Sequence, residues 1–462
     1  MEEDPMAVAL PEDALAEILR RLPLRSLATS RCVCKAWCAI VDGRRLLLRE
    51  LLPHSVRGIF LKYTDLDYPA FLSHPSMEPN ILGKLNFHRL PGHWNTASIR
   101  SHCNGLLLYQ DMEGLHVSNP ATQWRASLPP PPPPHPDRLY ERPHLVFDPT
   151  ESLHYEVLLV PSSSLTTEER DEPSKEWPAS VWVLCAFSSR TGQWEERAFV
   201  REGEAAGMAS DEVLQRSNAF SQGCSAYWHG ALFVQCNAGF TVMRISLSNN
   251  KYRVVKMPTD IGEIEYYHVY LGRSKGGLCC ASFHDWHKLR VWILDDSGGT
   301  IEWVLKHHID IHNSVAPVRR HVEENNGPWI LEDANSGEHY GQHNLQDVNK
   351  DEDHNNNALV KSKVEWDSDN DNIVDNESEI IQCFSGYISV LGFHPYKDII
   401  FLNLSLDRAL AYHLNTSTVQ DLGKICPNDY GGTAAEITSS FPYTPCLISD
   451  FPENKLEALV EG

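Results

Sequence analysis

The sequence has little that would mark a membrane-bound or secreted protein. None of its 462 residues lies in the run of roughly 18 uninterrupted apolar residues that a membrane-spanning helix requires. The chain starts MEEDP, with acidic residues where a secretory signal has basic ones. We therefore expect a protein of the cytoplasm, the nucleus or both, with no membrane partner.

Positive charge is also scarce in this chain. Lysine and arginine number 40 against 62 aspartate and glutamate residues, which gives a formal net charge of -22. Proteins that bind nucleic acid or anionic membranes need a basic surface. The balance of charge therefore excludes nucleic acid as an expected partner.

Motifs with catalytic chemistry are missing as well. The chain has no G-x-S-x-G or H-E-x-x-H sequence, and GRSKGG at 272–277 lacks the glycine spacing of a phosphate-binding loop. Two close histidine pairs, His284 with His287 and His307 with His308, are interpreted as exposed strand or turn residues. We predict no catalytic residues, no metal site and no cofactor.

The twelve cysteines follow no regular spacing. In a reducing compartment they are expected to be free thiols that pack as small apolar side chains. Cys32, Cys34 and Cys38 form a C-x-C-x3-C pattern with no second pair of ligands nearby, which a structural zinc site would require. The pattern therefore favours packing over metal binding.

The segment 10–41 has the apolar spacing of short helices. Leu15, Ile18, Leu19 and Leu22 fall on one face of a helix that Pro23 ends, and two further stripes cover 24–32 and 33–41. Helices this short are not stable alone and must pack on one another. Such a small bundle leaves apolar surface for a partner. The alternative is the core of a larger helical domain, which the strand-like sequence that follows disfavours.

In order along the chain, this segment resembles the F-box motif. The matching residues are Leu10, Pro11, Asp13, Leu15, Ile18, Leu19, Arg21, Leu22, Pro23, Ser26, Leu27, Val33, Cys34, Lys35 and Trp37. The resemblance departs at Thr29 and Cys38, where many relatives carry basic residues. It implies docking on the Skp-family adaptor of a cullin-RING ubiquitin ligase.

The resemblance also implies which residues lie at or near the adaptor. They are Leu10, Pro11, Ile18, Leu22, Pro23, Val33, Cys34, Lys35 and Trp37. We assign Leu15, Leu19 and Leu27 to the core of the bundle instead.

From about residue 55 the sequence changes to short apolar runs separated by turn residues. A unit of paired strands with a glycine turn recurs, and Gly230 and Gly277 in two such units are 47 residues apart. This is within the length of a four-stranded propeller blade. We predict an all-β domain, a β-propeller of six to eight blades; an irregular β-sandwich or barrel is the alternative.

Two motifs in this region resemble the F-box-associated, kelch-like region of plant F-box proteins. One is Asn119, Pro120, Thr122 and Trp124, repeated in part over 191–194; the other is S-x-C-N-G-L-L over 101–107. Asn-Pro and Thr-Gly also favour turns, and tryptophan fills space between sheets.

Two segments interrupt the predicted strands. Prolines at 129–134 and 136 predict a polyproline II segment over 129–136, either a linker or a ligand for an SH3- or WW-like module. Residues 347–379 hold 11 acidic residues against three lysines, and we predict a disordered acidic insertion over 312–380. Its Asp367, Asp369 and Asp371 resemble a calcium loop, but Asn372 and Ser378 replace the required glycine and glutamate.

The predicted organisation is stated by residue range. The ranges are a tail over 1–9, the F-box helices over 10–52, the β domain over 55–311 and 381–450, and a tail over 451–462.

These expectations favour a substrate receptor of an SCF-type (Skp–cullin–F-box) ubiquitin ligase. The propeller would bind an unknown target protein, with Trp228, His284, Trp286 and Tyr396 as candidate rim residues. One alternative is a propeller-based small-molecule sensor or enzyme, which would need acids, histidines or a metal converging in the central channel. Another is an F-box scaffold that acts outside ubiquitylation.

Overall fold

The structure is a computed structural model of the 462-residue chain. It describes residues 11–22, 24–44, 46, 51–64, 66–75, 97–133, 141–161, 176–208, 225–235, 241–258, 269–285, 287–297, 301–315, 327–332, 373, 386–427, 430, 436–448 and 451. The predicted tail over 1–9, all but the first residue of the predicted tail over 451–462, and most of the predicted acidic insertion lie outside these residues.

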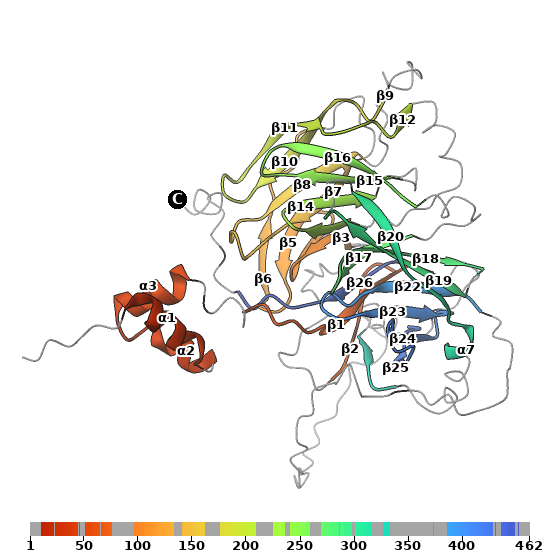
Figure 1. The fold of residues 1–462 in the computed structure, drawn as a ribbon. Helices are drawn as coiled ribbons and strands as arrows, with labels where there is room; N and C mark the ends of the chain where they lie inside the picture. Colours follow the sequence, from red (N-terminus) through yellow and green to blue (C-terminus); the bar gives the residue numbers. More distant parts are fainter. Residues whose placement is uncertain are drawn as a thin grey trace, which may run out of the picture.

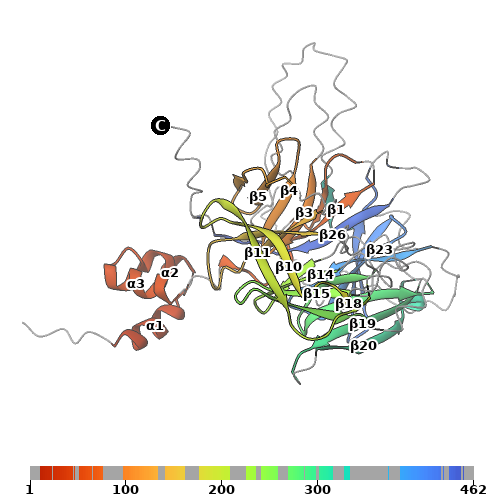
Figure 2. The same ribbon diagram turned by 90° about the horizontal axis from the view of Figure 1, so that it is seen from above.

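Three short helices occupy the N-terminal segment: α1 (Glu12–Arg20), α2 (Leu24–Ser30) and α3 (Lys35–Gly43). In α1, acidic side chains in the first turn face the positive end of the helix dipole. Each helix contacts the other two. Figures 1 and 2 show this unit to one side of the strand-rich body.

The helices share a small core. Its buried members are Ala16, Leu19, Leu27, Ile40, Val41 and Leu46. Leu15, Leu22 and Trp37 are half-buried against it. The assignment of Leu19 and Leu27 to the core is confirmed, and Leu15 lies at its edge.

The rest of the described chain is mostly antiparallel β-sheet, as predicted. Three four-stranded sheets each follow chain order. They consist of β3 (Ser98–Cys103), β4 (Leu106–Gln110), β5 (Leu115–Asn119) and β6 (Trp124–Ser127); β17 (Tyr270–Ser274), β18 (Gly277–His284), β19 (Lys288–Asp295) and β20 (Glu302–Asp310); and β22 (Ile388–Phe393), β23 (Ile399–Leu404), β24 (Arg408–His413) and β25 (Val419–Lys424).

An eight-stranded sheet consists of two antiparallel halves. One half contains β7 (Glu141–Val146), β8 (Glu156–Pro161), β10 (Val181–Ser188) and β11 (Gln193–Arg201), and the other β13 (Ser225–Trp228), β14 (Ala231–Gln235), β15 (Thr241–Ser246) and β16 (Lys251–Lys256). Only a short parallel pairing joins them, Val200 with Lys251 and Arg201 with Tyr252. Each half therefore has the strand number of the separate sheets. A small pair, β9 (Glu176–Trp177) with β12 (Gly207–Met208), lies beside the first half.

The last four-stranded sheet joins the two ends of the β domain. β26 (Ile437–Tyr443) pairs with β1 (Gly58–Tyr63), which pairs with β2 (Ala70–Ser73) and through it with β21 (Ile330–Glu332). Phe60 of β1 lies opposite Phe441 of β26, within a buried aromatic cluster. The C-terminal strand thus closes the domain against its first strand.

The strand at one edge of each sheet lies near the middle of the domain. Contacts link β3 with β7 and β13, β13 with β17, β17 with β22, and β22 with β26. Figure 1 shows β3, β17 and β26 in the centre of the body, with the outer strands of each sheet pointing away. This radial arrangement is that of a β-propeller, in which ring closure protects the sheet edges.

The two sequence motifs make long-range contacts beyond the turns predicted for them. Gly105 has a positive φ of 87°, and a Cβ there would lie 2.5 Å from the Cys446 backbone nitrogen. The Asn119 side chain donates hydrogen bonds to the carbonyls of Cys446 (2.8 Å) and Ile448 (3.1 Å). Both motifs therefore hold the segment that follows β26 beneath the β3–β6 sheet.

Parts of the two predicted interruptions are described. Residues 129–133 form an irregular segment, and the Trp194 indole donates a hydrogen bond to the Pro129 carbonyl. Within 312–380, residues 312–315 form the short helix α7 (His312–Val315), β21 extends the closing sheet, and Ile373 bridges to Gln420. The predicted insertion thus begins with elements that pack on the propeller. No helix among the described residues is long and apolar enough to cross a membrane.

Candidate binding surfaces

One face of the helical unit leaves large apolar side chains in water. Ile18 and Val33 have exposed fractions of 48% and 62%. The next residue, Leu19, is buried. Consecutive residues of an α-helix point about 100° apart, so Leu19 can face the core while Ile18 faces the solvent. A small core with exposed isoleucine and valine beside it is a feature of surfaces that bind other proteins.

A shallow hollow of about 360 Å³ lies on this unit. Its walls are Leu22, Ser26, Thr29, Ser30, Val33 and Trp37. Three of these, Leu22, Val33 and Trp37, are residues that the F-box resemblance assigns to the adaptor surface. Sequence separation alone could not show that they share one hollow.

The other predicted adaptor residues are distributed as follows. Pro11, Cys34 and Lys35 are exposed, and Leu10 and Pro23 lie outside the described residues. Cys32 is exposed and Cys38 is half-buried, and both are free thiols, like Cys34. Where the structure describes side chains, these cysteines form no group with metal-ligand geometry.

A salt bridge joins the start of α1 to the chain just after α3. Arg44 lies 2.6 Å from Asp13 and 3.5 Å from Glu12. The hydrogen bond to Asp13 raises the pKa of Arg44, despite partial desolvation. The pair is exposed, so it positions the helix ends more than it stabilises them.

On the propeller, a hollow of about 1060 Å³ opens where several inner strands end. Residues at or just after the ends of five such strands line it: Asn104 of β3, Trp228 of β13, Arg273 of β17, Tyr396 of β22 and Thr444 of β26. We call it the face hollow. It brings together two of the predicted rim residues, Trp228 and Tyr396.

The other two predicted rim residues do not join them. His284 ends β18, lies 3.5 Å from Asp285, and does not line the face hollow. Trp286 lies outside the described residues. The hairpin between β18 and β19 is therefore separate from the candidate site.

Sequence reasoning missed His54, which belongs to the chain that leaves the helices. The His54 ring stacks on the Tyr396 ring with centroids 4.1 Å apart. The Arg273 guanidinium lies 5.4 Å from the centroid of the Tyr396 ring. Burial raises the pKa of Tyr396. The connecting segment is also fixed by a hydrogen bond of 2.8 Å from the Leu447 amide to the Leu51 carbonyl. The chain between the two domains thus lies against the face hollow.

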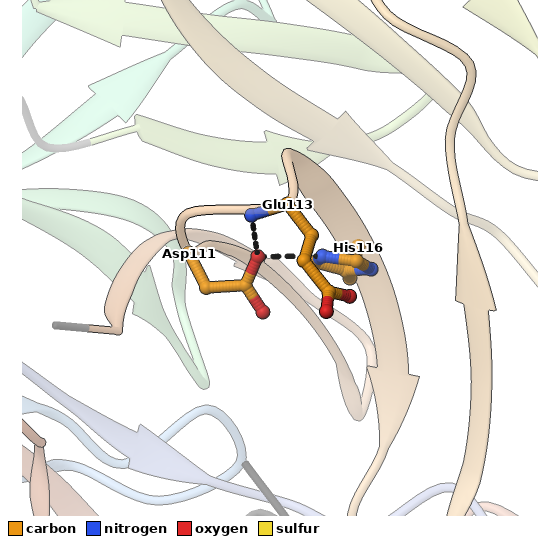
Figure 3. Close-up of side chains that lie close together, drawn as sticks. All are labelled: Asp111, Glu113 and His116. Carbon is orange, nitrogen blue, oxygen red and sulfur yellow. Dashed lines mark hydrogen bonds and ion pairs between the residues drawn. The ribbon is translucent and has the colours of Figure 1, made fainter. Parts of the chain in front are cut away.

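A third group has the residue types of a metal site. Asp111, Glu113 and His116 bring their ligand atoms within 4.8 Å of one another at the β4–β5 turn (Figure 3). The Asp111 carboxylate accepts a hydrogen bond from Nε2 of the His116 ring at 2.9 Å and another from the Glu113 backbone N–H at 2.8 Å. Burial opposes ionisation of Asp111, but these hydrogen bonds lower its pKa.

Arg125 of β6 places a positive charge next to Asp111 and His116. Its guanidinium lies 3.6 Å from the Asp111 carboxylate and 3.1 Å from Nδ1 of His116. The same Nδ1 lies 3.0 Å from the Ser127 hydroxyl. A guanidinium already balances the carboxylate, so a metal ion would have to displace it. The geometry therefore favours a structural network that fixes the β4–β5 turn.

Comparison with protein families matches two regions of the chain. Residues 9–49 match the F-box domain, and residues 70–325, more than half of the chain, match the F-box associated beta propeller domain. The F-box match covers the helices with the exposed apolar face, and the second match covers most of the sheets.

Relatives from Arabidopsis thaliana are named as F-box proteins. The F-box protein At5g52610 is 25% identical over 307 residues, which cover 64% of this chain and 76% of that protein. The F-box/kelch-repeat protein At3g61590 is 35% identical over 132 residues, or 26% of this chain and 30% of that protein. Among solved structures, YCF48 bound to D1 peptide has 9% identity, covers 87% of this chain and 95% of that chain, and gives a TM-score of 0.32.

Proposed function

Because the chain belongs to the F-box proteins with an F-box-associated β-propeller domain, we propose that it is the substrate receptor of an SCF-type ubiquitin ligase. The helical unit docks on the Skp-family adaptor, and the propeller binds the protein to be ubiquitylated. The observation that carries the proposal is the exposed apolar face of the helices, with Ile18 and Val33 in water beside the hollow of Leu22 and Trp37.

This face has more apolar surface than the helices can bury themselves. Burying one isoleucine or valine side chain contributes about 1.5–3 kcal/mol. Two such side chains, with the half-buried Leu22 and Trp37 as neighbours, form the apolar centre that a protein interface needs. Adaptor docking would supply the missing cover.

The propeller serves as the second binding module. We infer six blades: the four separate four-stranded sheets and the two halves of the eight-stranded sheet. The face hollow, with Trp228 and Tyr396 in its wall, is the candidate target site. Its area offers aromatic side chains, which dominate binding energy at interfaces.

The receptor would act by proximity and contribute no catalytic group. Two binding modules on one chain raise the effective concentration of the target beside the conjugating enzyme. The packing of Leu51 and His54 on the propeller keeps the start of the second module close to the helices. We propose the cytoplasm, the nucleus or both as the site of action, where these ligases encounter their targets.

Adaptor capture by the purified full chain tests the proposal. We expect wild type to bind a Skp-family adaptor and the Ile18→Asp/Val33→Asp variant to lose it. Ala39→Asp is the matched control, because Ala39 is exposed and lies about 200° round α3 from Trp37. Circular dichroism checks that all three proteins fold alike.

Each outcome has a consequence. A wild type that fails to bind the adaptor overturns the proposal, as does equal loss of binding in Ala39→Asp. If the adaptor binds but a reconstituted cullin-RING ligase transfers no ubiquitin to the receptor itself, the chain acts as an adaptor-bound scaffold.

A further inference from the structure

A second cavity lies inside the propeller, between its inner strands. It measures about 140 Å³, and residues of β3, β13, β17, β22 and β26 or their ends form its wall. We call it the central channel. Its described lining includes no aspartate or glutamate, although the chain has 62 of them.

The charged residues that do line the channel are arginines. Arg100 lies near the start of β3, and Arg273 lies near the end of β17, where the face hollow opens. Neither makes an ion pair with a carboxylate among the described residues; Arg100 donates only to the Gln110 amide, at 3.1 Å. Burial and the nearby charge of Arg142 lower the pKa of Arg100. The channel lining thus holds two guanidinium groups that no described carboxylate pairs with: Arg273 beside the face hollow, and the exposed Arg100 further back along β3.

His102 of β3 also lines the channel, two residues after Arg100. Its ring stacks on Phe441 with centroids 3.9 Å apart and planes inclined by 9°. Its ring nitrogens make no hydrogen bond to the described residues, yet they keep access to the channel. Protein encloses the ring closely enough that burial lowers its pKa to about 4. A neutral imidazole with no partner is a donor available to a ligand.

Opposing charge comes from outside the channel. Asp148 lines the face hollow, and its charge and that of Arg273 both influence the buried Cys103. It makes no ion pair with Arg273 within 4 Å. The Ser440 hydroxyl, buried in the channel wall, also has no hydrogen-bond partner among the described residues. Three polar side chains of the channel wall, Arg273, His102 and Ser440, therefore have no acceptor among the described residues, whereas Arg100, Asn104 and Tyr270 donate to protein oxygens.

We propose that the central channel binds a small organic anion. Its oxyanion, a carboxylate or a phosphate, pairs with Arg273 and accepts a hydrogen bond from His102. The remaining surface is aromatic, with Tyr270, Phe393 and Phe441 in the wall, and suits a flat apolar body.

The cavity volume limits the size of this ligand. A protein cavity of roughly 150 Å³ accommodates a benzene molecule. The channel is of that size, so it admits one ring with an acid group and excludes nucleotides and peptides. Binding would bridge inner strands of different blades, and it does not depend on the adaptor.

Calorimetry on the full chain at constant ionic strength tests the site. The probes are benzoate, inorganic phosphate and benzamide, the last having the shape of benzoate without its charge. We expect one benzoate per chain and no binding of benzamide. Binding should weaken at least about tenfold in Arg273→Gln, because the substitution removes a charge-assisted hydrogen bond.

Two further variants separate the channel from other sites. Arg190→Gln, in the face hollow, should leave the affinity unchanged, and Arg273→Lys should keep part of it. Phosphate binding with the same pattern would show that the oxyanion alone suffices. Absence of binding by both anions overturns the inference, as does equal binding of benzamide or equal loss in Arg190→Gln.

Discussion

The helical unit and the propeller dispose of their apolar residues in different ways. In α1, one large residue, Leu19, is fully buried, and its neighbour Ile18 is 48% exposed. In β23, all six residues are buried, because blades cover both faces of the strand. Exposed apolar residues of the propeller, such as Val200 of β11 and Leu305 of β20, lie on the last strand of their four-stranded unit. The propeller therefore buries its apolar residues within its own core, whereas the helical unit leaves apolar side chains exposed that a partner could cover.

The largest expected effect is on the closure of the propeller. Phe60 is 1% exposed. Its ring centroid lies 4.5 Å from that of Phe71, 5.3 Å from that of Phe441 and 5.6 Å from that of Tyr443. Phe60→Ala should lower the free energy of unfolding by about 3–5 kcal/mol, because it leaves a cavity where the first and last strands meet. Urea unfolding followed by tryptophan fluorescence measures the loss.

The matched control for this variant is Ile330→Ala in the same sheet, where the side chain is 56% exposed. It should change stability by less than about 0.5 kcal/mol. At low denaturant, Phe60→Ala should still capture the adaptor. Parallel loss of capture and propeller stability would mean that the two regions fold as one unit.

The next effect falls on the helical unit. Leu19 is fully buried in a core of six residues. Leu19→Ala should destabilise the helices by about 3 kcal/mol, within the range for leucine truncation, and abolish adaptor capture. The fluorescence transition of the propeller should not move. A shift of that transition would contradict the independence of the two cores.

These contacts show what sequence periodicity could and could not predict. Leu19 and Leu27 were predictable because a helical stripe is local, with partners three or four residues apart. The alternation of short strands indicated an all-β domain for the same reason. Trp228 and Tyr396 were predicted as candidate rim residues, although only the fold could show that they line one hollow.

Long-range contacts escaped that reasoning. Ring closure pairs Phe60 with Phe441, and His54 stacks on Tyr396. No local pattern marks which strand of a blade faces the channel, so Arg100, His102 and Arg273 could not be grouped. A propeller-based sensor was expected to need acids, histidines or a metal converging in the central channel. The described lining of the channel contains His102, Arg100 and Arg273, and no acid.

Acid should affect the two regions unequally. Residues 1–53 contain no histidine, whereas the propeller buries His144 at 2% exposure, with a hydrogen bond of 2.9 Å to Ser225. Burial, helped by Arg142, lowers the pKa of His144 to about 3. The unfolded chain takes up a proton below about pH 6.5, and the folded chain does not. Stability from this group is therefore complete above that pH and is lost as pH falls toward 3.

The slope should reach about 1.4 kcal/mol per pH unit for this histidine. His144→Gln keeps a polar partner for Ser225 without a titrating ring, so its stability should depend less on pH between 6.5 and 4. Urea midpoints across that range give the slopes. Identical slopes for wild type and variant would exclude His144 as the source.

The smallest effect on stability is expected at Ile18, and it completes the comparison with Leu19. Ile18→Ala removes a side chain that is 48% exposed in the free protein, so unfolding should change by less than about 0.5 kcal/mol. The same methyl and methylene groups become buried if the adaptor covers this face. Their loss should then weaken adaptor binding about tenfold, equivalent to about 1.4 kcal/mol of apolar burial. Calorimetric titration with the adaptor, beside a urea melt of the same sample, separates the two quantities. If Ile18→Ala lost stability and kept affinity, the exposed face would belong to the folding of the helices, and the adaptor would have to bind elsewhere.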